Sequence, residues 1–415
     1  MRILFATDQY FPTLGGISTV TYRLAKTLTS LGNEVVIIAP SVSWKFKEEK
    51  QDGFTIFRVQ SLPLIKTKDL RYSPTFLYTY KIKKIIKTFM PDIIHIETPN
   101  DIGWITVQIA KKLFIPIIGT CHIMPQNISA ALPFLPSRIG KVAGEFYMKQ
   151  MVQVFNKIDF VTAPTPTGIA ILKAYGIKIP SQALSNGIDL KEFSDRTSNE
   201  KEAERIKLKI SAAPLILYVG RLDKEKRVNI LIQALKLIRD GSPFHAVIAG
   251  TGKEAIPLRE LVLASGLQDK VTFMGIIPKE ELGSLYSVAS IFVMPSTAEL
   301  QSLVTMEAMA LKLPVIGAKA GALPYLIKPN MNGFLFKPDN PEDLAKKIAI
   351  LLKDKDLREK MGKESYRIIQ EHDINAVTKE LENLYRRIIE EKKRQKTTVK
   401  NKFKMLWHSY MNRND

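Results

Sequence analysis

A chain of 415 residues is long for a single hydrophobic core, so we expect two packed domains. Hydrophobic residues make up 45% and charged residues 25%, which excludes a disordered or fibrous protein, and the single cysteine, Cys121, excludes an intrachain disulfide and favours a reducing compartment. The net charge of +20 predicts an anionic partner, which could be nucleic acid, anionic lipid or a phosphorylated ligand.

The amino-terminal half predicts a Rossmann-type domain. Its first apolar run, residues 3–7, is too short for a secretory signal, and no stretch of the chain approaches the roughly 18 apolar residues of a spanning helix. Helical spacing over residues 20–31 and a second run at 34–39 complete a β-α-β unit. Further runs lie at residues 93–96, 115–119 and 159–163. We therefore expect a mostly parallel sheet.

The alternating pattern restarts after the charged residues 200–209 and predicts a second α/β domain. Its strands are expected at residues 215–219, 246–249, 271–273, 291–294 and 314–316. The turn residues Asn186, Gly187 and Asp189 separate the two halves. The predicted segments are a first domain over 1–185, a second over 186–372, a helix over 373–390 and a basic tail over 391–415.

Two carboxylates, Glu299 and Glu307, lie where a predicted strand gives way to a predicted amphipathic helix. Backbone N–H groups at a helix start bind phosphate, and a carboxylate accepts hydrogen bonds from sugar or ribose hydroxyls. The segment therefore suits a nucleotide-sugar. Taken alone, the pair is better explained as acidic residues that the helix macrodipole favours.

Cations follow the predicted strand 215–219, where Arg221 and Lys226 lie between the strand and the next helix. Open α/β sheets bind ligands at this edge, and cations there can stabilise a pyrophosphate whose charge grows as a sugar leaves. An ordinary charged loop is the alternative. A third segment, Gly15-Gly16 after the first strand, permits close backbone approach to a ligand, although it lacks the dinucleotide-binding fingerprint.

Together these segments resemble the family 4 retaining glycosyltransferases, also called glycosyl transferases group 1. The hallmark of that family is a Glu, seven residues and a second Glu, which Glu299 and Glu307 match. Further matching segments are Gly15-Gly16 and residues 119–122, 185–189, 220–227 and 295–321. The resemblance implies a GT-B fold of class α/β, in which two Rossmann-like domains face each other across a cleft and a C-terminal helix crosses back to the first domain.

The resemblance also implies roles for the matching residues. Glu307 would bind the ribose hydroxyls, and Arg221 and Lys226 would neutralise the diphosphate leaving group. The other donor-binding residues would be Gly15, Gly16, Leu300, Gln301, Ser302 and Leu303. His122 would hydrogen-bond the donor sugar near the reacting carbon, and Glu299 would hold that sugar. The expected catalytic set is thus His122, Glu299, Arg221 and Lys226.

The family uses no divalent metal, so the resemblance implies no metal and no cofactor, with a UDP- or GDP-sugar as the donor substrate. A loop histidine with a backbone partner is the alternative interpretation of His122.

The acceptor is suggested by a departure from the commonest family pattern. The order Glu299-Leu-Gln301-Ser302 replaces Glu, any residue, Phe, Gly, and similar Gln-containing variants occur among transferases that glycosylate diacylglycerol. Residues 122–127 resemble the acceptor loop of lipid-directed members, which act on diacylglycerol or phosphatidylinositol. This makes Met124, Gln126 and Asn127 candidate acceptor-side residues.

The resulting hypothesis is a hexosyltransferase (EC 2.4.1.-) that moves glucose or mannose onto a membrane lipid or lipid-linked glycan, in glycolipid biosynthesis of the cell envelope. A family member with a soluble sugar acceptor is the first alternative. A basic nucleic-acid-binding protein is the second, but no nucleic-acid-binding module is recognisable, so no nucleic-acid partner is expected.

Three segments predict contact with an anionic membrane: the basic residues 45–87, the apolar residues 130–136, and the basic tail with Phe403, Leu406 and Trp407. The isoleucines within residues 78–89 are equally explained as a stripe that faces the core. The expected location is the cytoplasm, peripheral on the inner face of the plasma membrane.

Overall fold

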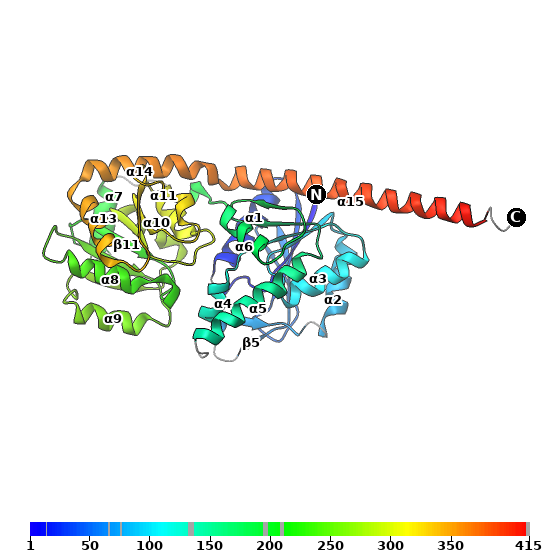
Figure 1. Ribbon diagram of the computed structural model, residues 1–415, viewed down its shortest axis with the longest axis horizontal. Helices are drawn as coiled ribbons and strands as arrows, with labels where there is room; N and C mark the ends of the chain where they lie inside the picture. Colours follow the sequence, from blue (N-terminus) through cyan, green and yellow to red (C-terminus); the bar gives the residue numbers. More distant parts are fainter. Residues whose placement is uncertain are drawn as a thin grey trace. The chain divides into compact units, whose positions relative to one another are not determined.

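The computed structural model describes residues 1–13, 15–64, 67–74, 77–131, 137–193, 198–207 and 211–411. The chain divides into two compact units (Figure 1). The first comprises residues 1–122, 148–187 and 374–415, and the second comprises residues 123–147 and 188–373. Each unit is built on a sheet of parallel strands with helices between them, so the predicted α/β class is confirmed.

The first sheet has the strand order β10-β9-β8-β7-β1-β2-β4-β3, and all neighbours are parallel except β3 and β4. Its strands are β1 (Arg2–Ala6), β2 (Glu34–Pro40), β3 (Lys47–Gln51), β4 (Phe54–Val59), β7 (Ile93–Ile96), β8 (Ile117–Thr120), β9 (Phe160–Ala163) and β10 (Ser181–Ala183). A separate antiparallel pair is formed by β5 (Leu62–Leu64) and β6 (Thr67–Tyr72). The strand order reverses at β1, between β7 and β2, which is where open α/β sheets bind ligands.

The helices of the first unit are α1 (Gly16–Ser30), α2 (Thr79–Phe89), α3 (Asp101–Lys112), α6 (Pro166–Ala174) and α15 (Ile374–Met411), and α5 (Ser137–Phe155) has residues in both units. In α2 the three isoleucines at positions 82, 85 and 86 are buried, whereas the lysines at 83, 84 and 87 are exposed. The isoleucine stripe therefore packs into the core, and the charge faces solvent.

The second sheet is entirely parallel, with the order β13-β12-β11-β14-β15-β16. Its strands are β11 (Leu215–Val219), β12 (His245–Ala249), β13 (Val271–Gly275), β14 (Ile291–Met294), β15 (Val315–Ala318) and β16 (Gly333–Phe336). The order reverses at β11, between β12 and β14. β11 and β14 are buried along their whole length, as continuous apolar runs predict for central parallel strands.

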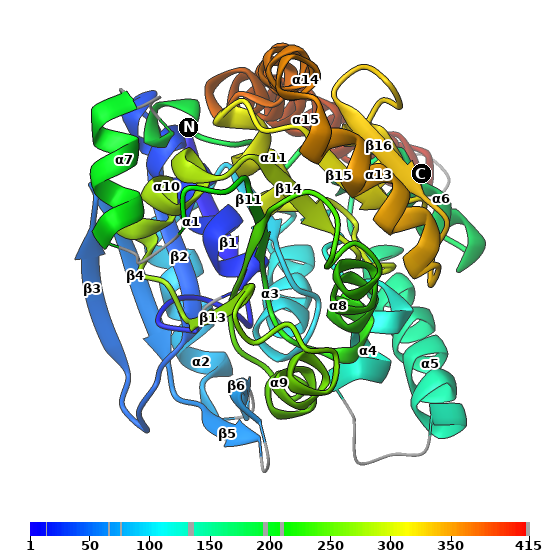
Figure 2. The ribbon, with the colours of Figure 1, turned by 90° about the vertical axis from the view of Figure 1, so that its left-hand side faces the viewer.

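The helices of the second unit are α4 (Pro125–Ala131), α7 (Ser198–Lys207), α8 (Val228–Leu237), α9 (Ala255–Ala264), α10 (Lys279–Val288), α11 (Leu303–Ala310), α12 (Leu323–Leu326), α13 (Pro341–Lys353) and α14 (Lys355–Ile369). Single 3-10 turns are η2 (Leu190–Glu192), η3 (Lys224–Lys226) and η4 (Gln370–His372). α8 packs beside both α13 and α9 (Figure 2). Among the described residues, no helix combines the length and the apolarity that crossing a bilayer requires.

The domain limits differ from the predicted ones. The chain passes into the second unit at Ile188, not at residue 186, and residues 123–147, predicted in the first domain, belong to the second unit. Residues 123–147 group with the second unit because α4, which lies within this segment, contacts η3. α15 continues to Met411, so residues 391–411 extend the predicted helix. The side chains of residues 130–136, and those of Phe403, Leu406 and Trp407, lie outside the described part of the chain.

Two glycines allow the loops after β11 and β12 to meet backbone against backbone. A Cβ on Gly250 would lie 1.8 Å from the carbonyl oxygen of Gly220, and one on Gly252 would lie 2.4 Å from the carbonyl oxygen of Leu222. Gly250 also has φ +132, which residues other than glycine rarely adopt. The loops at the switch point of the second sheet therefore depend on these glycines.

We expect Gly250→Ala to destabilise the second unit by more than about 2 kcal/mol, because the backbone must move and the φ value is unfavourable for alanine. Gly15→Ala is the matched control, since an added Cβ there meets no atom within 4 Å and φ is extended. Differential scanning calorimetry measures both. Melting of Gly250→Ala together with the wild type would contradict the close loop packing.

Candidate functional site

The carboxyl edge of the second sheet brings together two predicted residues from distant segments. Lys226 follows β11 and Glu299 follows β14, and Lys226 Nζ lies 2.6 Å from Glu299 Oε1. The two side chains are only 15% and 10% exposed. The loops themselves are joined, because Thr297 N donates a hydrogen bond to the Glu225 carbonyl oxygen at 3.3 Å. The result is a mostly buried ion pair at the switch point of the sheet.

Arg221 lies in the same loop as Lys226 but is 59% exposed. Its guanidinium donates to Asp223 and, at 2.8 Å, to Glu225 Oε1. Both predicted cations therefore already have carboxylate partners, which were not predicted. Glu299 holds Lys226 in place, whereas the exposed Arg221 has room to turn toward a bound anion.

The backbone at Glu299 is held by the loop after β15. Ala322 N donates to the Glu299 carbonyl oxygen at 2.8 Å. Gly321 has φ +55, and a Cβ there would lie 2.7 Å from the same oxygen. Only glycine permits this close approach, so Gly321 helps to hold the Glu299 backbone in place.

The segment after Glu299 is closely packed and leads into α11. Leu300, Gln301 and Ser302 are buried, and Leu303 begins the helix. Ser302 at the N-cap makes no side-chain capping hydrogen bond. The first backbone N–H groups of α11 are therefore not capped by this side chain, and such groups can bind an anion.

Glu307 lies within α11 and is buried, with its Oε2 accepting a hydrogen bond from Tyr286 Oη at 3.1 Å. All six residues from Thr305 to Ala310 are buried. The prediction of an amphipathic helix here is therefore wrong, because α11 packs within the core on all sides. Burying a carboxylate is costly unless it is hydrogen-bonded, and Tyr286 supplies one such bond.

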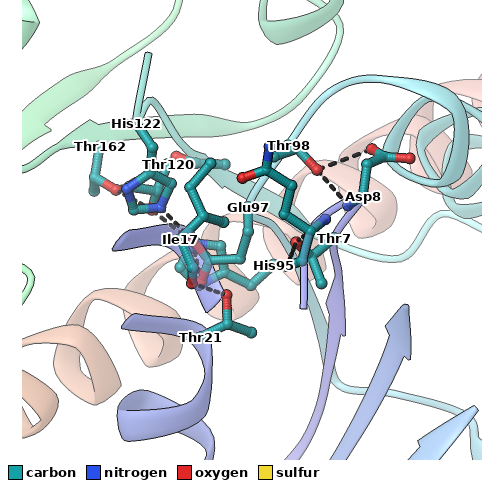
Figure 3. A network of polar contacts seen from close by, with 12 residues as sticks. Thr7, Asp8, Ile17, Thr21, His95, Glu97, Thr98, Thr120, His122 and Thr162 are labelled. Carbon is teal, nitrogen blue, oxygen red and sulfur yellow. Dashed lines mark hydrogen bonds and ion pairs between the residues drawn. The ribbon is translucent and has the colours of Figure 1, made fainter. Parts of the chain in front are cut away.

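The carboxyl edge of the first sheet holds a second buried pair. His122 follows β8 and Glu97 follows β7, and His122 Nε2 lies 2.5 Å from Glu97 Oε2 (Figure 3). The two side chains are 5% and 0% exposed. His122 thus has a carboxylate partner, in place of the backbone partner of the alternative interpretation. Burial opposes the ionisation of Glu97, but the pKa of Glu97 is nevertheless lowered, and the hydrogen bond with His122 favours the ionised carboxylate.

Glu97 was not among the predicted residues. The available signal was His95-Ile-Glu97 at the end of a predicted strand, because alternate residues at a strand end carry two polar side chains to one face.

Asp8, after β1, is a further buried carboxylate that was not predicted. It accepts hydrogen bonds from Ile102 N and Thr98 Oγ1, each at 2.8 Å. Burial raises its pKa to about 7, against the lowering effect of these bonds. Along the chain it precedes the exposed Gly15 and Gly16, where Gly15 is the N-cap of α1 and makes no side-chain cap bond. That helix start can also bind an anion.

The three predicted acceptor-side residues have different environments. Met124 is buried, and its backbone exchanges hydrogen bonds with Asn127, whose Oδ1 accepts from Met124 N at 2.9 Å. Asn127 therefore stabilises the start of α4. Gln126 is the one of the three with an exposed side chain.

The predicted residues are thus distributed over both units. His122, Gly15 and Gly16 belong to the first unit, and Arg221, Lys226, Glu299, the following segment and Glu307 belong to the second. Among the described residues, no group of three His, Cys, Asp or Glu side chains is placed to hold a metal ion.

Comparison with known proteins gives two family matches that adjoin along the chain. Residues 14–192 match Glycosyltransferase Family 4, and residues 200–368 match Glycosyl transferases group 1. The alpha-monoglucosyldiacylglycerol synthase of Streptococcus pneumoniae is 27% identical, over 83% of this chain and 77% of that protein. The synthase of the same name from Acholeplasma laidlawii is 25% identical, over 94% of this chain and 98% of that protein.

Among solved structures, sucrose-phosphate synthase from Thermosynechococcus elongatus superposes with a TM-score of 0.77, at 21% identity, over 94% of this chain and 99% of that one. This likeness establishes the GT-B fold.

Proposed function

Because the chain belongs to the family 4 glycosyltransferases, we propose that it transfers a hexose from a nucleotide-diphosphate sugar to a membrane lipid. The Lys226–Glu299 pair at the switch point of the second sheet carries the proposal. It combines a cation for a diphosphate with a carboxylate for sugar hydroxyls at the sheet edge where ligands bind.

In the proposed reaction, the bond between the sugar carbon and the diphosphate oxygen breaks, and the diphosphate leaves with the electron pair. The acceptor hydroxyl oxygen bonds to the same carbon, and its proton passes to the leaving diphosphate. We infer that Lys226, Arg221 and the start of α11 stabilise the growing negative charge, since they combine two cations with backbone N–H groups. Glu307 would bind the ribose, with Tyr286 holding its other oxygen.

The acceptor class is inferred from the relatives. The two bacterial proteins are named as synthases of alpha-monoglucosyldiacylglycerol, and this chain matches them over most of its length. We therefore infer glucose as the sugar and diacylglycerol as the acceptor. The alternative with a soluble acceptor is supported by the fold likeness at 21% identity and by a D-inositol 3-phosphate glycosyltransferase from Streptomyces bingchenggensis, which is 26% identical over 84% of this chain. For the nucleic-acid alternative, the positive charge has another explanation in an anionic donor and an anionic membrane.

Peripheral docking on the inner face of the plasma membrane completes the proposal and places the enzyme in the cytoplasm. We assign this docking to α5, where Ile139, Val142 and Phe146 share one face and are 52%, 67% and 62% exposed. The exposed cations near them are Arg138, Lys141 and Lys149. Apolar side chains bordered by cations match the chemistry of an anionic bilayer surface. The exposed lysines of α2 supply further positive charge.

The two carboxylates of the second unit should have separable effects. Glu299→Gln is expected to lower kcat about tenfold or more while nucleotide affinity changes little, because it removes the charge that holds Lys226. Glu307→Ala should weaken UDP or GDP binding roughly tenfold. Steady-state kinetics and calorimetric titration measure these effects, with Glu359→Gln as an exposed control on α14. Unchanged kinetics and binding in both variants would refute the site.

The reaction itself is tested with purified protein, diacylglycerol in mixed micelles and UDP- or GDP-hexoses. We expect a glycolipid whose anomeric configuration is that of the donor, and we expect activity to persist in EDTA, because cationic side chains take the role of a metal in the proposed reaction. NMR of the product gives the configuration. An inverted product, strict dependence on Mg²⁺, or transfer to soluble sugars only would each contradict a part of the proposal.

Membrane docking is tested by co-sedimentation with anionic and neutral liposomes at low and high salt. Binding should be stronger to anionic vesicles and should fall as salt rises. Val142→Ser with Phe146→Ser should weaken this binding, whereas Phe114→Ser should not, since Phe114 is also 62% exposed but lies just beyond α3. Equal binding to both lipid types, or equal loss in the control, would contradict docking through α5.

A further inference from the structure

A continuous set of buried polar side chains crosses the first unit from α15 to β9. Tyr385 Oη lies 2.6 Å from His95 Nδ1, and His95 Nε2 lies 2.7 Å from Thr120 Oγ1. Thr120 Oγ1 lies 2.7 Å from Thr162 Oγ1, which donates to the Gly119 carbonyl oxygen at 3.4 Å. All four side chains are buried, and Figure 3 shows the part around His95, Thr120 and Thr162. The set ties α15 to three neighbouring strands.

The carbonyl at the end of this set defines the direction of every bond in it. A carbonyl oxygen only accepts, so the Thr162 hydroxyl donates to Gly119 and accepts from the Thr120 hydroxyl. Thr120 in turn accepts from His95 Nε2–H, and His95 Nδ1 accepts from the Tyr385 hydroxyl. Burial lowers the pKa of His95, which keeps the ring neutral with its one proton on Nε2.

Glu97 lies between this set and His122. An ionised carboxylate accepts hydrogen bonds but cannot donate, so the proton in the 2.5 Å contact belongs to His122 Nε2. The other oxygen, Oε1, has no hydrogen-bond partner among the described residues, and His95 Nε2 lies 3.8 Å from it. The remaining polar atom of the His122 ring is Nδ1.

We propose that Glu97 is a positioning residue, which fixes the ring orientation of His122 and keeps its proton on Nε2, so that Nδ1 is the nitrogen that meets the donor sugar. Tyr385 of α15 holds the His95 ring, which lies beside Glu97, so the C-terminal helix contributes to the same arrangement. The contact of Nδ1 with the sugar rests on the proposed function, whereas the placement of the His122 proton on Nε2 does not depend on it.

The first test needs no substrate. In the full chain labelled with ¹⁵N-histidine, long-range ¹⁵N–¹H correlation spectra report which ring nitrogen carries the proton, and His122→Ala identifies the His122 signals among the five histidines. We expect His122 to be protonated on Nε2, and we expect that pattern to change in Glu97→Gln, because an amide can donate to the ring. An unprotonated Nε2 in the wild type would overturn the proposal even if no Glu97 variant folds.

The second test separates positioning from structure. Glu97→Gln should lower kcat at least about tenfold with little change in the affinity for the nucleotide, and Glu97→Asp should recover part of that loss because the charge remains. Tyr385→Phe should lower kcat by less. Asp159→Asn is the matched control, because it also replaces a carboxylate with an amide. Asp159 lies at the opposite edge of the sheet and pairs with Lys392 of α15 at 2.5 Å.

The outcomes distinguish the two hypotheses. If Asp159→Asn lowers kcat as much as Glu97→Gln, or if Glu97→Gln alters neither the His122 spectrum nor kcat, Glu97 does not position His122. If the wild type transfers no sugar but His122 carries its proton on Nε2, the placement by Glu97 stands and the proposed function fails.

Discussion

Parallel strands place all their carboxyl ends at one edge of a sheet, and both units of this protein carry their polar chemistry at that edge. The first sheet reverses its strand order at β1, and the second does so at β11. At each reversal, consecutive loops diverge to opposite sides and leave space for a ligand. The Glu97–His122 and Lys226–Glu299 pairs lie just beyond strands that flank or follow these positions. The positions of the pairs thus follow from sheet topology.

Charge compensation is the second principle that these sites share. A buried ion is stable only when a partner offsets the loss of hydration. Glu97 has His122, Lys226 has Glu299, and even the exposed Arg221 has two carboxylates. Glu299 already orients the buried Lys226, so the binding of an anion at this cation would need little reorganisation.

The C-terminal helix connects stability with the first site. α15 packs on α1, and its Tyr385 reaches His95 inside the sheet, while Lys392 on the same helix pairs with Asp159 at the other edge. The contacts between α15 and the first sheet therefore join residues that are far apart in the chain. By packing in this way, α15 supports both the first sheet and His122, which follows β8.

The sequence determined the two α/β units, because apolar runs of strand length alternate with helical spacing. The predicted runs at 93–96, 215–219 and 291–294 coincide with β7, β11 and β14. Those strands are central and buried on both faces, so their sequences are continuously apolar. β3 was missed because it is an exposed edge strand with the sequence Lys-Glu-Glu-Lys-Gln, and β10 because it has only three residues. Such strands are defined by their neighbours and not by a pattern of their own.

The sequence also supplied Glu299, Glu307, Arg221, Lys226 and His122 as candidates, through strand ends and family spacing. The partners of Arg221 are local, but tertiary structure alone decided those of Lys226, Glu299 and His122. Glu97 is 25 residues from His122, and Lys226 is 73 residues from Glu299, so no local pattern encodes either contact. Tyr385 is 290 residues from His95. Side chains pair across a sheet edge only after the strands have been ordered in space, and that order arises from the packing of the whole unit and not from any one segment.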